Sequence, residues 1–276
     1  MSAPDHMSPA ALAASAYEVV LVLCGLWLTW KCVLAPAGPA GRPQRLAPWD
    51  IPPIDFACFL CFAFVGATAV SAAASYLLKH AHLSEDQSMV AGGAVMHIGI
   101  LVGVAGFFAA YGARQRPLAG DSGLRADLLS GLATFLIGVP IVAATSIAWD
   151  YVVTKLGLPD DKQDMVQILE DSHSKGLILA LVAVATLLVP VTEELVFRAG
   201  LFRYFRTRVP RWAAVLLTSV LFGALHMSWS SFAPLTVLAV LFCLAYERTG
   251  SIRTTMVAHA LFNLNTFIIV VAGLGQ

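Results

Sequence analysis

Acidic, basic and amide side chains recur at helical spacing in the last hundred residues, within stretches that are otherwise apolar. The three stretches are Glu193-Glu194-x-x-x-Arg198, Phe222-x-x-x-His226 and His259-x-x-x-Asn263. An ionisable group in the middle of a membrane span costs roughly 2.5 to 3.5 kcal/mol on insertion scales, so such groups are functional candidates. A carboxylate, two histidines and an amide can together activate water and stabilise an oxyanion, as peptide hydrolysis requires.

The spacing gives the two neighbouring glutamates different roles. Glu194 and Arg198 are four residues apart on one helix face and can pair. Glu193 is turned about 100° away around the helix, so we expect its carboxylate to stay free. His259 and Asn263 are also four residues apart, and their side chains should project from one helix face toward the same point. The alternative is a buried polar network that only holds the helices together.

The same residues could bind a metal ion. Glu193, His226 and His259 would supply the three protein ligands of a catalytic zinc site, with water as the fourth. The HExxH zinc motif is absent from the sequence, and Asn263, a poor zinc ligand, shares the helix face of His259. We therefore favour water activation by glutamate and histidine, with the cofactor unknown: either none or a divalent metal such as zinc.

Other polar or small residues in apolar stretches carry less information. Glu18 and His97 each stand alone, and we expect both to be structural, because isolated polar groups usually find a local partner. Cys58 and Cys61 lack a second pair to complete a tetrahedral metal site. Gly99-x-x-x-Gly103 allows close helix packing but is common by chance.

The elements that must position these motifs are membrane-spanning helices. The chain has 276 residues, of which 58% are apolar and 12% charged, with mean hydropathy +0.78, whereas a soluble domain is about one quarter charged. A span needs roughly 20 apolar residues, and eight segments approach this length: about 11–34, 54–78, 89–111, 128–149, 176–197, 212–227, 232–246 and 252–272. The sixth and seventh are short. We predict an all-α integral membrane protein, a bundle of about eight transmembrane helices.

Charge indicates the partner and the orientation. With 17 basic and 17 acidic residues there is no overall positive field to attract nucleic acid. Twelve basic residues fall in the loops after the first, third, fifth and seventh spans, and four in the other loops. The positive-inside rule then places both termini on the non-cytoplasmic side of a lipid bilayer.

A polar stretch over residues 150–174 divides the chain into two parts. Residues 1–174 would form about four N-terminal helices and this outer loop, and residues 175–276 the helices that carry the three motifs. Met165, Ile168 and Leu169 lie at helical spacing within the stretch. We expect a solvated connector with one amphipathic turn, and the alternative is a lid.

Depth within the membrane is harder to reconcile. At about 1.5 Å per residue, Glu193 and His259 both lie about 8 to 9 Å from the inner edge, whereas His226, counted from Arg211, lies about 22 Å deep. Either the sixth helix starts well outside the bilayer or is strongly tilted, and Arg203 to Arg211 could be a helical extension.

In order and spacing, the three motifs resemble those of the CAAX-protease and bacteriocin-processing (CPBP) family of intramembrane proteases, which includes type II prenyl-protein endopeptidases. The resemblance covers about a third of the chain, roughly residues 175–270. It implies an eight-helix bundle with a polar cavity. It also implies roles for six residues: Glu193 as general base with His226 beside it, His259 and Asn263 as oxyanion donors, and Glu194 and Arg198 as positioning groups, with Phe222 as a supporting residue.

The resemblance implies an endopeptidase in the bacterial inner membrane. Its substrate would be a membrane-associated or lipid-modified polypeptide, such as a prenylated, CAAX-like one. The alternatives are a non-catalytic membrane scaffold or bacteriocin immunity protein, and a proton-linked transporter that uses Glu193, His226 and His259 as a relay. Transporters often contain two-fold repeats, and none is evident in this sequence. The sequence does not indicate an oligomeric state.

Overall fold

The structure is a computed structural model that describes residues 8–34, 46–77, 79, 81–111, 123–159, 164–172 and 174–273. Over these residues it consists of helices and connecting segments, with no strands. Six long helices are α1 (Pro9–Thr29), α2 (Pro53–Leu77), α3 (Glu85–Tyr111), α4 (Leu124–Leu156), α10 (Trp229–Thr249) and α11 (Ile252–Val271). A short π-helix, η1 (Trp30–Leu34), extends α1.

A seventh long helical segment carries the first motif. It runs from Lys175 to Arg206 and comprises α6 (Lys175–Ala183), η4 (Val184–Leu188), α7 (Val189–Glu193), η5 (Glu194–Phe202) and α8 (Arg203–Arg206). Both η elements are π-helices. These seven segments are long and apolar enough to cross a membrane, and α9 (Arg211–Leu225) is shorter, with 15 residues. The prediction of an all-α, multi-pass integral membrane protein is confirmed.

Two predicted boundaries are wrong. The seventh span is not short, because α10 has 21 residues and begins at Trp229, where the Ser228 side chain caps its first turn. The polar stretch 150–174 does not begin as a loop, because α4 continues to Leu156 and ends at Gly157 in the left-handed region, with φ 62°. The rest of that stretch contains α5 (Asp164–Asp171).

The apparent mismatch in depth results from a wrong helix end. The fifth span was expected to stop near residue 197, but the helix continues through the buried Arg198 and Arg203 to Arg206. Glu193 lies thirteen residues before Arg206 and His226 fifteen after Arg211. Both are thus about 20 to 22 Å from the same turn between α8 and α9.

The basic side chain that was taken as the inner edge for α11 is also misleading. Arg253 Nε lies 2.6 Å from Oδ2 of the buried Asp127 on α4, and Ser251, just before α11, is fully buried. The helix therefore starts among buried residues rather than at a membrane surface. Four of the twelve basic residues assigned to inner loops, Arg42, Arg45, Arg114 and Arg116, lie outside the described residues, as do Asp160, Asp161 and Lys162 of the polar stretch.

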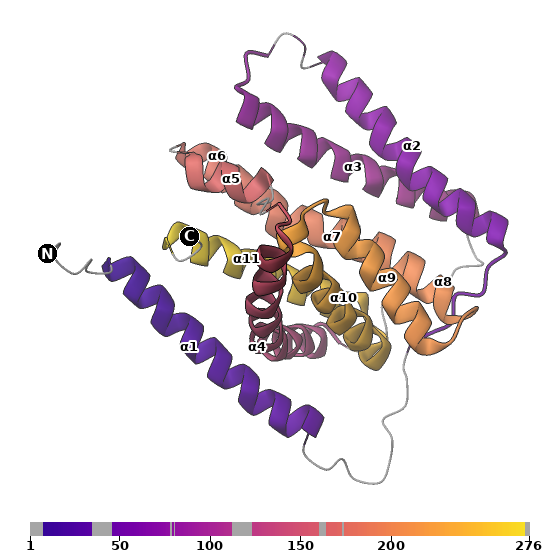
Figure 1. Cartoon of the computed structure of the whole chain (residues 1–276). Helices are drawn as coiled ribbons and strands as arrows, with labels where there is room; N and C mark the ends of the chain where they lie inside the picture. The colour runs from indigo at the N-terminus through magenta and orange to yellow at the C-terminus, as the bar shows by residue number, and fades with distance from the viewer. Residues whose placement is uncertain are drawn as a thin grey trace, which may run out of the picture.

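The helices are arranged as a central group with a hairpin and one flanking helix (Figure 1). α4, α10 and α11 pack around a core that contains Phe135, Leu238 and Phe242. The α2–α3 hairpin packs through Phe59 and Phe107 against the Lys175–Arg206 segment. α1 packs along α4. This arrangement brings all three motifs to the middle of the molecule.

Candidate functional site

A cavity of about 550 Å³ lies where α3, α4, α5, the Lys175–Arg206 segment, α9, α10 and α11 meet. Much of its wall is apolar and includes Val142, Leu235, Leu238, Phe262 and Phe267. Five of the seven residues predicted from the motifs also line it: Glu193, Phe222, His226, His259 and Asn263. The other two, Glu194 and Arg198, are not among its lining residues and are fully buried.

The ion pair expected from the i, i+4 spacing is present. Arg198 Nη1 lies 2.9 Å from Glu194 Oε1, and both side chains have 0% exposure. The guanidinium also stacks near the rings of Phe222, at 4.5 Å, and Phe242, at 5.0 Å. A buried carboxylate without a partner would be strongly destabilising, so Arg198 is the group that allows Glu194 to be buried and ionised.

The His259 ring bridges the two glutamates. Its Nδ1 lies 3.0 Å from Glu194 Oε1, and its Nε2 lies 3.7 Å from Glu193 Oε2. Because an ionised carboxylate only accepts hydrogen bonds, Nδ1–H donates to Glu194 and fixes the ring. The Glu193 side chain is 18% exposed and lines the cavity. The adjacent glutamates thus have separate roles: Glu194 holds His259, and Glu193 faces the space where a substrate would bind.

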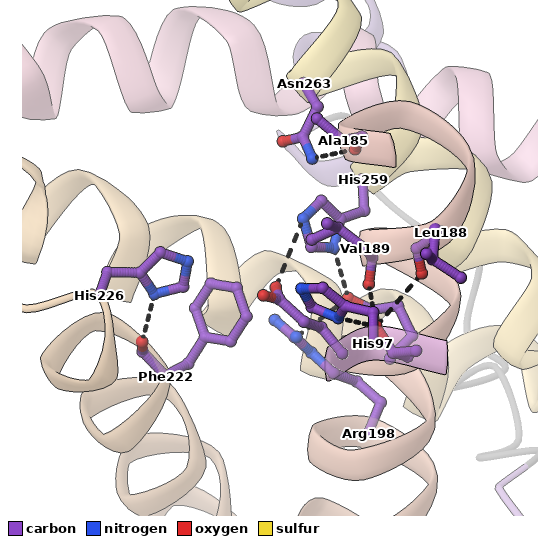
Figure 2. A network of polar contacts seen from close by, with 12 residues as sticks. His97, Ala185, Leu188, Val189, Arg198, Phe222, His226, His259 and Asn263 are labelled. Carbon is purple, nitrogen blue, oxygen red and sulfur yellow. Dashed lines mark hydrogen bonds and ion pairs between the residues drawn. The ribbon is translucent and has the colours of Figure 1, made fainter. Parts of the chain in front are cut away.

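His226 shares the cavity with Glu193 but is not directly beside it. Its Nδ1–H donates to the Phe222 carbonyl at 2.8 Å, because a carbonyl oxygen can only accept. The Phe222 ring lies 4.8 Å from the His226 ring and 6.1 Å from the His259 ring, measured between centroids. Figure 2 shows His226 across the site from His259. The fixed Nδ1 proton leaves Nε2 of a neutral His226 as an acceptor.

Asn263 makes a contact that its spacing from His259 does not predict. Its Nδ2 donates to the Ala185 carbonyl in η4 at 2.7 Å. The side chain still lines the cavity, one helical turn from His259 (Figure 2). One of its two N–H groups is therefore used inside the protein, and the second is left to serve the cavity.

His97 is a member of the site that the sequence did not reveal. It has the local partner expected for a structural histidine, because its Nδ1 lies 2.6 Å from Thr192 Oγ1. It does not stand apart, however, because it lines the same cavity as Glu193 and His259. The Thr192 hydroxyl also lies 2.9 Å from the Val189 carbonyl and has one proton to donate to it. Thr192 therefore accepts from His97 Nδ1–H, which leaves His97 Nε2 as an acceptor.

The three predicted metal ligands are not arranged as a metal site. Among the residues that the structure describes, no group of three or more His, Cys, Asp or Glu side chains could hold a metal ion. Glu193, His226 and His259 line one cavity without converging on one point. The candidate chemistry is therefore derived below from the side chains themselves.

Comparison with known proteins matches the part of the chain that carries the motifs. Residues 175–265 match the family model "Type II CAAX prenyl endopeptidase Rce1-like". The "Putative membrane peptidase YdiL" of Bacillus subtilis (strain 168) is 28% identical over 90 residues, which are 33% of this chain and 36% of that protein. This chain thus spans about a third of the length of its curated relative. No solved structure matches the chain. The resemblance to the CPBP family is therefore confirmed over residues 175–265 of an integral, multi-pass membrane protein.

Proposed function

We propose that this protein is an intramembrane endopeptidase that hydrolyses a peptide bond in a membrane-associated polypeptide. The observation that carries the proposal is the contact between His259 and two glutamates in different surroundings. One, Glu194, is buried and paired with Arg198, and the other, Glu193, lines a cavity among apolar helices. The Rce1-like match and the peptidase name of the relative support the same class of reaction.

In the first step Glu193 is the general base. Its carboxylate takes a proton from a water molecule, and the water oxygen bonds to the carbonyl carbon of the substrate. The electron pair of the carbonyl double bond moves to the carbonyl oxygen, which becomes an oxyanion. His226 Nε2, an acceptor in the cavity wall, can hold the second water proton and so orient the attack.

The oxyanion is stabilised by His259 and Asn263. An imidazole that donates from Nδ1 to Glu194 can also donate from Nε2 only as an imidazolium. Two carboxylates beside the ring, offset by one guanidinium, favour that positive charge. The second N–H of Asn263 is the other donor. When the C–N bond breaks, the leaving nitrogen takes the proton that Glu193 holds.

The substrate class follows from the cavity walls. Apolar side chains from α4, α10 and α11 surround the polar residues, which suits an apolar peptide segment or a lipid-modified one. A prenylated, CAAX-like polypeptide of the bacterial inner membrane fits this description, and the printed name of the matching family supports it.

The experiment compares membrane proteomes of cells that express the wild type, Glu193→Gln or Glu18→Gln. Glutamine fills the volume of glutamate but cannot accept the proton, so Glu193→Gln should accumulate an uncleaved substrate. Glu18 lies on α1, outside the residues that line the cavity, so Glu18→Gln is a matched control that should retain the cleaved product. The same fragments in all three samples would remove Glu193 as the base. A scaffold would keep its partner bound in every sample without any cleavage.

A further inference from the structure

A proline leaves one backbone carbonyl in the cavity wall without a helical donor. In η4 the hydrogen bonds span five residues, as from the Val189 N–H to the Val184 carbonyl. In this register the next donor, to the Ala185 carbonyl, would be residue 190. Residue 190 is proline, which has no N–H. Because Ala185 is buried, its carbonyl needs a donor from elsewhere in the protein.

That donor is Asn263. Its Nδ2 lies 2.7 Å from the Ala185 oxygen, a contact between residues 78 positions apart in the sequence and drawn as a dashed line in Figure 2. A carbonyl can only accept, so the amide must turn its nitrogen, not its oxygen, toward Ala185. The contact therefore selects one of the two orientations of the Asn263 amide.

We propose that Pro190 is a positioning residue that sets the orientation of Asn263 for catalysis. This inference rests on the proposed function, in which Asn263 donates to the oxyanion. With the first N–H held by Ala185, the planar amide keeps its second N–H available to the substrate. If the amide flipped, it would present an oxygen to a developing negative charge, which destabilises the transition state. Pro190 prevents this by leaving the Ala185 carbonyl open to Asn263.

The test is a set of four proteins: wild type, Pro190→Ala, Asn263→Ala and the double variant. Alanine at position 190 supplies a backbone N–H that competes for the Ala185 carbonyl. Pro190→Ala should lower kcat about tenfold or more with KM unchanged, and Asn263→Ala should lower it on the order of 10²–10³-fold. Because Pro190 acts through Asn263, the double variant should be no slower than Asn263→Ala alone. Losses that multiply, or full activity of Pro190→Ala, would overturn the inference.

A second measurement does not depend on enzymatic activity. Asn263→Ala should lower the melting temperature in the Pro190 background, where the Ala185 carbonyl loses its donor, but not in the Pro190→Ala background, where the new N–H replaces it. An equal decrease in both backgrounds would overturn the inference even if no substrate is found. If the wild type cleaves nothing while the melting temperatures still couple, the proposed function fails and the contact stands.

Two further variants keep the test sharp. Pro190→Ser restores the same N–H with a different side chain, so it should reproduce both effects of Pro190→Ala if that variant folds poorly. Pro140→Ala removes another proline from inside a helix, in α4, at a position that does not line the cavity. Its kcat should equal that of the wild type, and a tenfold loss there would mean that any helix proline has this effect.

Discussion

Arg198 is the residue on which the burial of the site depends. It neutralises Glu194, which in turn orients His259, and it packs between two aromatic rings. Removing it leaves a buried carboxylate with no cation, and breaking a buried pair in this way costs about 3 to 5 kcal/mol.

We therefore predict that Arg198→Ala lowers both the melting temperature in detergent and the expression level, in addition to activity. The control is Arg125→Ala, because Arg125 is exposed at the start of α4 and its removal should change stability by less than about 0.5 kcal/mol. Thermal unfolding of both variants, followed by circular dichroism, measures the difference. Equal melting temperatures for the two would show that the Glu194–Arg198 pair does not support the fold.

His97 gives a second prediction for a single residue. Its Nε2 is an acceptor in the wall of the cavity, and a phenyl ring of similar shape cannot accept a hydrogen bond. We expect His97→Phe to lower kcat/KM about tenfold or more, consistent with the loss of one polar contact to substrate or water, and to leave the melting temperature nearly unchanged. A lower melting temperature with normal kcat/KM would mean that His97 serves only to hold Thr192.

The sequence contains the information for contacts along one helix, but not for contacts between helices. Glu194 and Arg198 could be paired from their spacing because four residues bring two side chains to one helix face. Neither the His97–Thr192 contact nor the Asn263–Ala185 contact has such a signal, because each joins residues that are far apart in the sequence.

At the scale of elements, apolar length predicted the helices but not their internal register. The segment from Lys175 to Arg206 alternates between α and π hydrogen bonding, and hydrophobicity does not distinguish the two. The expected end near residue 197 was therefore wrong, because Arg198 and Arg203 look like the end of a span but are enclosed by other helices.

The α2–α3 hairpin provides a prediction at this scale. A Cβ atom on Gly103 would clash with the backbone carbonyl of Phe62 on α2, whereas one on Gly92 of the same helix would have no atom within 4 Å. Gly103→Ala should therefore lower the melting temperature, since overpacking typically costs about 1 to 3 kcal/mol.

Gly92→Ala is the matched control. It should leave stability unchanged or raise it by roughly 0.5 to 1 kcal/mol, the intrinsic gain of alanine in a helix. Melting temperatures of the two variants in the same detergent make the comparison. If both variants are equally stable, α2 and α3 do not need the close approach that the Gly99-x-x-x-Gly103 motif allows.

At the scale of the whole molecule, the number of crossings determines where the termini lie. Seven long segments and the 15-residue α9 make eight crossings in the described part of the chain if α9 spans the membrane. At about 1.5 Å per residue α9 is about 22 Å long, less than the roughly 30 Å of a hydrocarbon core. An even number would put both termini on one side, and the basic residues favour the non-cytoplasmic side.

A fusion of alkaline phosphatase after the last residue should therefore be active, and a fusion of green fluorescent protein at the same point should be dark. The turn between α8 and α9 is the control position, where Arg206, Arg208 and Arg211 predict a cytoplasmic location, so the two reporters should behave in the opposite way there. Fluorescence from the C-terminal fusion would indicate an odd number of crossings.

The π-helical turns of η4 and η5 also affect how this segment can change in evolution. A π turn holds more residues than an α turn, because its hydrogen bonds span five residues instead of four. Deleting one residue between Glu194 and Phe202 would allow the shorter ladder to close and would turn everything after it by about 100°. Arg203, whose Nε donates to the Ala47 carbonyl at 3.2 Å, would then rotate away from that partner. The number of residues in this segment is thus as constrained as their identity, and related sequences should tolerate substitutions here far more readily than gaps.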